Sequence, residues 1–126
     1  MTTVTFRMEG TRITGFDSQG HSGYAEAGAD IVCAAVTSAI RLVEATVNDV
    51  LGLAASVKIR EREASISFRL PGGLSPTAES ACQALLAGLM VYLTELHDEY
   101  PENIEVLEDE QFSPSKNSQR KDGPLS

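Results

Sequence analysis

Two short stretches near the start of the chain alternate between apolar and polar positions. Residues 3–9 alternate around Val4, Phe6 and Met8, and residues 12–18 alternate around Ile13 and Phe16. A two-residue period is typical of strands with one buried face, and the Gly10 between the two stretches favours a turn. The pattern therefore predicts a β-hairpin.

A second pair of alternating stretches lies in residues 57–70. Val57 and Ile59 alternate with basic residues in the first stretch, and apolar residues of the second recur at every other position, at Ile66, Phe68 and Leu70. The charged sequence Glu-Arg-Glu at 61–63 separates them and suits a turn, so we expect a second hairpin.

Two longer segments have the three-to-four-residue period of amphipathic helices. The first begins at Asp30 and ends near Gly52, and the second begins at Ser75-Pro76 and ends near Tyr100. Asp30 and Ser75 are favourable N-caps, and proline is favoured at a first helical position. The apolar stripe is Val32, Val36, Ala39, Val43, Val47 and Val50 in the first helix, and Ala78, Cys82, Leu85, Leu86, Leu89, Leu93 and Leu96 in the second.

This order of elements predicts an α+β fold, a two-layer sandwich in which an antiparallel sheet is covered by two helices (ββαββα). Residues 104–107 can add a short final strand. We expect residues 1–107 to form one domain. Residues 108–126 are acidic and then rich in polar residues, so we expect a disordered tail there.

Both helices also carry apolar residues away from their main stripes. These are Ile31, Ile40, Leu42 and Leu51 on the first, and Ala84, Ala87, Met90 and Val91 on the second. A helix that is apolar on two sides is typically buried on two sides, and the sheet covers only one. We therefore expect a homodimer that pairs the helices across a two-fold axis.

The formal net charge of −8 disfavours nucleic acid as a direct partner, because phosphate binding needs clustered Lys and Arg. A basic peptide or protein is compatible with this charge. The sequence has neither a membrane-spanning apolar run nor a signal-peptide pattern, and its two cysteines fall in different predicted helices. We therefore expect a cytoplasmic protein with free thiols, no membrane partner, no metal and no cofactor.

The residues best suited to catalysis lie between Gly20 and Ile40. The segment from Gly20 to Ala29 is rich in glycine and aperiodic, which predicts a loop with His21 at its start and Cys33 just beyond its end. Unpaired N–H groups at a helix start stabilise a thiolate, and an imidazole can take up the thiol proton. The sequence leaves open whether Asp30 caps the helix, orients the imidazole or does both.

The string Gly20-His21, a short glycine-bearing loop and then Asp30-Ile31-Val32-Cys33-Ala34-Ala35 resembles the signature of the ribosomal-processing cysteine protease (Prp) family. The resemblance covers residues 2–107 in element order and length. It implies that Cys33 is the nucleophile, that His21 is the general base and that Asp30 has a supporting role. The family has a serine four residues after the cysteine, where this chain has Thr37.

The resemblance also implies a reaction, the removal of a short N-terminal extension from large-subunit ribosomal protein number twenty-seven. Gly20, Gly23, Tyr24 and Gly28 then belong to a loop that admits an extended peptide. One alternative is a dimeric binding module that associates with the ribosome and has no catalytic function. Another is a different thiol enzyme, such as an acyl transferase. A thiol at a helix start facing a histidine favours the protease over the binding module.

Overall fold

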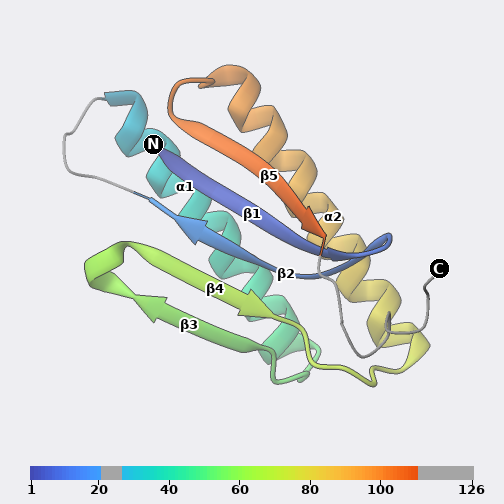
Figure 1. The fold of residues 1–126 in the computed structure, drawn as a ribbon. Coiled ribbons are helices and arrows are strands. Elements are labelled where there is room, and N and C mark those ends of the chain that lie inside the picture. Colours follow the sequence, from blue (N-terminus) through green and yellow to red (C-terminus); the bar gives the residue numbers. More distant parts are fainter. Residues whose placement is uncertain (21–26, 111–126) are drawn as a thin grey trace.

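The computed structural model of the chain describes residues 1–20 and 27–110. The predictions for His21, Gly23, Tyr24 and most of the tail, residues 111–126, lie outside the described residues. Within the described part, a five-stranded sheet packs against two long helices, and both helices cover the same face of the sheet (Figure 1). The predicted two-layer α+β sandwich is confirmed.

The two predicted hairpins are present. The first joins β1 (Thr2–Glu9) to β2 (Arg12–Gln19), and the second joins β3 (Ser56–Arg60) to β4 (Ser65–Arg69) through a 3-10 turn, Glu61–Glu63. The strand order is β3-β4-β2-β1-β5, and the first four strands are antiparallel. The N-terminal hairpin therefore forms the middle of the sheet.

The final strand is longer than predicted and pairs differently. β5 (Ile104–Glu110) continues past residue 107 and runs parallel to β1, so the sheet is mixed rather than antiparallel throughout. The acidic residues at the end of β5 lie opposite the end of β1, where Arg7 forms an ion pair with Asp109. Residues 108–110 thus belong to the sheet and not to the tail.

Three phenylalanines form a row across the middle of the sheet. Phe6, Phe16 and Phe68 are register partners on β1, β2 and β4, and all three are fully buried. The rings of Phe16 and Phe68 stack with centroids 5.1 Å apart. Aromatic pairs of this kind stabilise a fold by about 0.5–1.5 kcal/mol beyond their buried area. The three rings belong to the same buried core cluster as the apolar stripes of the helices.

The helices are α1 (Ala27–Glu44), which continues into a π-helical turn at Ala45–Val50, and α2 (Pro76–Glu99). The Ser75 side chain caps α2 by accepting a hydrogen bond from the Ala78 N–H, as predicted. The apolar stripes are also largely as predicted, but Ile40 is buried in the core and Val50 is 76% exposed. Val50 is the last residue of the π-helical turn, where the helical period differs from the 3.6 residues assumed in the prediction.

Candidate active site

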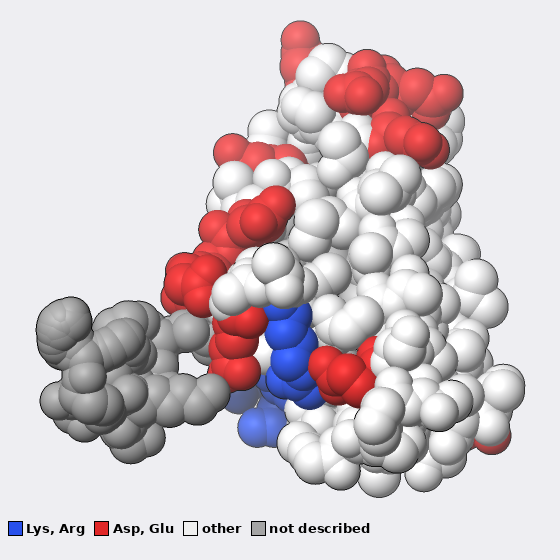
Figure 2. Space-filling model, turned by 90° about the vertical axis from the view of Figure 1, so that its right-hand side faces the viewer, with Lys and Arg blue, Asp and Glu red and all other residues white. Residues whose placement is uncertain are grey.

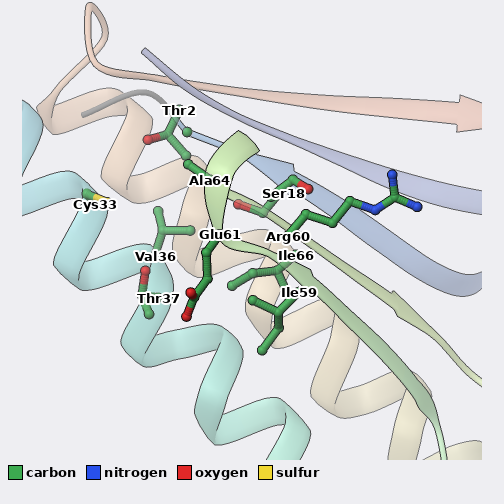
Figure 3. Close-up of a pocket in the computed structure, with 12 residues that line it drawn as sticks. Thr2, Ser18, Cys33, Val36, Thr37, Ile59, Arg60, Glu61, Ala64 and Ile66 are labelled. Atoms are coloured by element: carbon green, nitrogen blue, oxygen red, sulfur yellow. The ribbon is translucent and has the colours of Figure 1, made fainter. Parts of the chain in front are cut away.

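Cys33 lies in a pocket of about 220 Å³ between the first half of α1 and the tip of the β3–β4 hairpin (Figure 3). Its thiol is free and partly exposed. Three groups of residues line the pocket: Cys33, Val36 and Thr37 from α1; Thr2, Ser18 and Gly20 from the ends of β1 and β2; and Ile59, Arg60, Glu61, Ala64, Ser65 and Ile66 from the hairpin. An accessible nucleophile beside a cavity is the first geometric requirement of covalent catalysis.

Helix α1 begins earlier than predicted. It starts at Ala27, so Asp30 is an exposed residue inside the first turn and not the N-cap. Gly28, which we expected in the loop, is also helical. A Cβ on Gly28 would lie 2.9 Å from the Asn103 Oδ1, so α1 passes close to the residue that precedes β5. Gly28 therefore allows close packing against Asn103. The glycine-rich sequence had instead indicated that Gly28 belongs to a loop.

This earlier start places Cys33 beyond the first turn of α1. The N–H groups that lack a helical partner lie at the very start of a helix, before Asp30 in α1. The influence of a helix terminus fades within one turn. The free N–H groups at the start of α1 are therefore less directly placed to stabilise a thiolate or an oxyanion at Cys33 than the sequence suggested.

Thr37 follows Cys33 by one helical turn and lines the same pocket. Elsewhere in the helices, Thr46 and Thr94 each donate a hydrogen bond from the hydroxyl to the carbonyl four residues earlier, at 2.8 and 2.9 Å. Among the described residues, the Thr37 hydroxyl makes no such bond, and Figure 3 shows it on the pocket side of α1. A polar hydrogen is thus available to a group bound beside Cys33.

Gly20 forms part of the opposite wall, at the end of β2. Its N–H donates a 2.9 Å hydrogen bond to the carbonyl of Ala64, which ties the end of β2 to the hairpin tip. A Cβ at Gly20 would lie 3.3 Å from the Thr2 Oγ1. The structure thus brings Cys33, Thr37 and Gly20 to one pocket. Gly20 directly precedes His21 in the sequence.

The hairpin wall of the pocket was missed by sequence reasoning. The Glu-Arg-Glu turn carries charged residues that are typical of any exposed turn, and nothing in its pattern indicates that it folds over α1. Ala64 adopts a left-handed backbone conformation, with φ of 50°, where glycine is usual. No pattern in the sequence predicts this conformation, which directs the chain into β4.

The other cysteine is placed in the core. Cys82 on α2 is completely buried, and burial raises the pKa of its thiol, with a further rise from the nearby Glu79. The other histidine, His97, has its Nδ1 2.7 Å from the Ile104 carbonyl on β5. Within residues 1–20 and 27–110, no cluster of His, Cys, Asp and Glu is suited to a metal ion, and no helix is long and apolar enough to cross a membrane.

The family model described as cysteine protease Prp matches residues 1–105. The chain belongs to this family. It is 35% identical, over 97 residues, to the ribosomal processing cysteine protease Prp of Bacillus subtilis strain 168, covering 75% of this chain and 84% of that protein.

Solved structures share the fold. SMU.848 from Streptococcus mutans superposes with a TM-score of 0.76 at 22% identity, covering 88% of this chain and 96% of that one. The ribosomal processing protease Prp from S. aureus, in complex with a covalently linked product peptide, superposes with a TM-score of 0.67 at 25% identity. That match covers 86% of this chain and 100% of the S. aureus chain. The family and fold predicted from the sequence are thus confirmed.

Proposed function

We propose that the chain is a cysteine endopeptidase that removes the N-terminal extension of large-subunit ribosomal protein number twenty-seven during ribosome maturation. The observation that carries the proposal is the partly exposed Cys33 thiol in a pocket bounded by α1 and the β3–β4 hairpin. Support also comes from the Bacillus subtilis relative, which is named as a ribosomal processing protease, and from the S. aureus protein, which is described with a substrate peptide.

In this proposal Cys33 and His21 share the covalent chemistry. The imidazole of His21 takes the Cys33 proton, and the thiolate attacks the scissile carbonyl carbon to form a tetrahedral intermediate. When the C–N bond breaks, His21 gives the proton to the leaving amine and a thioester remains on Cys33. Water then attacks the thioester with His21 as base, which releases the extension with a free carboxylate and restores the thiol.

The supporting residues have separate roles in the proposal. The Thr37 hydroxyl donates to the oxyanion or holds a substrate carbonyl, because it faces the pocket one turn from Cys33. Asp30 orients the His21 imidazole and favours its protonated form. Gly20, Gly23 and Tyr24 border the entry of the peptide. Gly28 contributes indirectly, by allowing α1 to pack against Asn103.

We also propose that the protein acts as a homodimer in the cytoplasm, where it meets the ribosomal protein and not nucleic acid directly. The helix layer supports the dimer. Residues Ser80–Thr94 contain no charged side chain, and Val91 and Tyr92 are 58% and 42% exposed. Figure 2 shows carboxylates gathered along the β5 side of the molecule and a broad area without charged residues on the helix side. A second copy covering this face removes apolar surface from water.

The test is cleavage of the full-length ribosomal protein, followed by mass spectrometry. Wild type is expected to release the extension, whereas Cys33→Ala and His21→Ala leave the substrate intact. Cys82→Ala serves as the matched control, because Cys82 is buried away from the pocket and is expected to leave cleavage in place. Substrate that stays intact with wild type, while still binding to it, would overturn the protease and favour the binding module.

A further inference from the structure

Glu61 places a carboxylate at the pocket that holds Cys33. It is the first residue of the 3-10 turn at the tip of the β3–β4 hairpin, and its side chain is exposed. Figure 3 shows this side chain extending from the hairpin toward α1, on the side where Val36 and Thr37 lie. A bound peptide that reaches Cys33 therefore passes a negative charge.

Arg60, the other charged residue that borders the pocket, does not neutralise Glu61. Figure 3 shows the Arg60 side chain directed away from α1 and Cys33. Arg60 instead approaches Glu63, with 3.9 Å between the Arg60 Nη1 and the Glu63 Oε1. Among the ion pairs of the described residues none includes Glu61. The carboxylate is thus available to a cation supplied by another molecule.

The surface next to Glu61 is apolar. Val36, Ile59 and Ile66 contribute hydrocarbon to the pocket, and Ile59 remains 61% exposed. Lys and Arg side chains combine a long hydrocarbon stem with a charged end, and they commonly lay the stem on apolar surface while the end reaches a polar partner. Ile59 and the nearby Glu61 carboxylate therefore match the stem and the charged end of such a side chain.

We propose that Glu61 is a specificity-determining residue, which selects peptides carrying a Lys or Arg close to the scissile bond. The basic side chain lays its stem across Ile59 and pairs its charge with the Glu61 carboxylate. The inference rests on the proposed function in one respect, namely that the peptide reaches this pocket to meet Cys33. The pair is exposed, so its contribution is modest, about two- to fivefold in affinity at low salt.

The experiment uses peptides that span the cleavage junction of the ribosomal protein. Each position near the junction in turn carries either Lys or norleucine, which has a similar stem and no charge. For wild type, Lys at one position is expected to raise kcat/KM about two- to fivefold over norleucine. Glu61→Gln is expected to bring this ratio to one, and Glu61→Arg to invert it. The matched control is Glu105→Gln, which removes an exposed carboxylate on β5 that does not line the pocket and is expected to keep the wild-type ratio.

A second readout separates this inference from the proposed protease. Binding of the same fluorescent peptides to Cys33→Ala and to Cys33→Ala with Glu61→Gln is measured by anisotropy. A preference for Lys that depends on Glu61 supports the selection even if wild type cleaves none of the peptides, an outcome that would overturn only the protease. Cleavage or binding with the same Lys-to-norleucine ratio in wild type and Glu61→Gln would overturn the role of Glu61 and leave the protease standing.

Discussion

The Gln83 side chain on α2 holds both main-chain polar groups of Ile13 on β2. The Ile13 N–H donates to the Gln83 Oε1, and the Gln83 Nε2 donates to the Ile13 carbonyl, each at 2.7 Å. The pairing of β1 with β2 is irregular at this point, because the register passes from Arg7 opposite Gly15 to Met8 opposite Ile13. A bulge of this kind leaves main-chain groups without a strand partner, and Gln83 supplies one.

Replacing Gln83 should destabilise the fold through these two groups. Gln83→Ala is expected to lower the free energy of unfolding by about 1–3 kcal/mol, because a part-buried N–H and carbonyl lose their partners. Urea unfolding followed by circular dichroism measures the change. Ser80→Ala, an exposed position on the same helix, should change stability by less than about 0.5 kcal/mol. Equal effects of the two substitutions would contradict the role of Gln83.

A carboxylate on the open face of the sheet should make stability depend on pH. Burial by itself would raise the pKa of Asp17, but hydrogen bonds from Arg69, Ser67 and Arg7 outweigh burial and lower that pKa from 3.8 to about 2. Arg69 NH2 lies 3.0 Å, and Arg7 Nε 2.7 Å, from the Asp17 Oδ2. Because the pKa is lower in the folded state, this stabilisation is present above the unfolded value and is lost as the pH falls from about 4 to 2.

The variant Asp17→Asn isolates this effect. It is expected to melt at a lower temperature than wild type at pH 7, and the gap between the two should shrink as the pH falls toward 2, where the wild-type carboxyl becomes protonated. Thermal melts in a pH series provide the measurement. A gap that stays constant from pH 7 to pH 2 would show that the charge of Asp17 contributes nothing.

The two cysteines should react at very different rates in the folded protein. Cys33 is partly exposed at the pocket, whereas Cys82 is fully buried and burial raises the pKa of its thiol. Brief treatment with iodoacetamide, followed by peptide mass mapping, is expected to find Cys33 modified and Cys82 protected. In guanidinium chloride both should react. Comparable modification of the two thiols under native conditions would be inconsistent with the pocket described here.

The proposed homodimer can be tested on α2. Val91→Glu places a charge on the exposed apolar face of the helix layer and should convert the dimer to a monomer in sedimentation velocity experiments. Leu107→Glu makes the same change at an exposed site on β5, and the dimer should persist. Wild type that sediments as a monomer would refute the dimer directly.

The main elements could be predicted because their periods are strong. Alternation around Val4 and Phe6 gave the first hairpin, and the leucine stripe from Leu86 to Leu96 gave α2 with its Ser75 cap. The start of α1 was predicted at Asp30 rather than Ala27, because glycine near a helix start usually indicates a loop. Here Gly28 is needed for close packing on Asn103, a contact with a residue far away in the sequence.

Of the described part of the candidate site, the helical side and Gly20 were predictable, but the hairpin wall was not. Cys33 and Thr37 were identified from the sequence signature, and the structure brings them to one pocket. The hairpin wall with Ile59 and Glu61 could not be inferred, because local alternation says which face a residue occupies but not where the strand lies in the sheet. The parallel pairing of β5 could not be predicted for the same reason. The pattern of residues 104–110 is compatible with a parallel and with an antiparallel strand.

The position of β1 between β2 and β5 has a consequence for synthesis on the ribosome. Of the five described strands, β1 leaves the ribosome first, and it pairs along nearly its whole length with β5, the last of them, from Thr2 with Ile104 to Met8 with Glu110. Pairings this distant in sequence raise the contact order and slow folding. Until residue 110 has been made, β1 remains an open edge that can pair with other chains. Co-translational folding can therefore begin with the hairpin, but the sheet is completed only when nearly the whole domain has emerged.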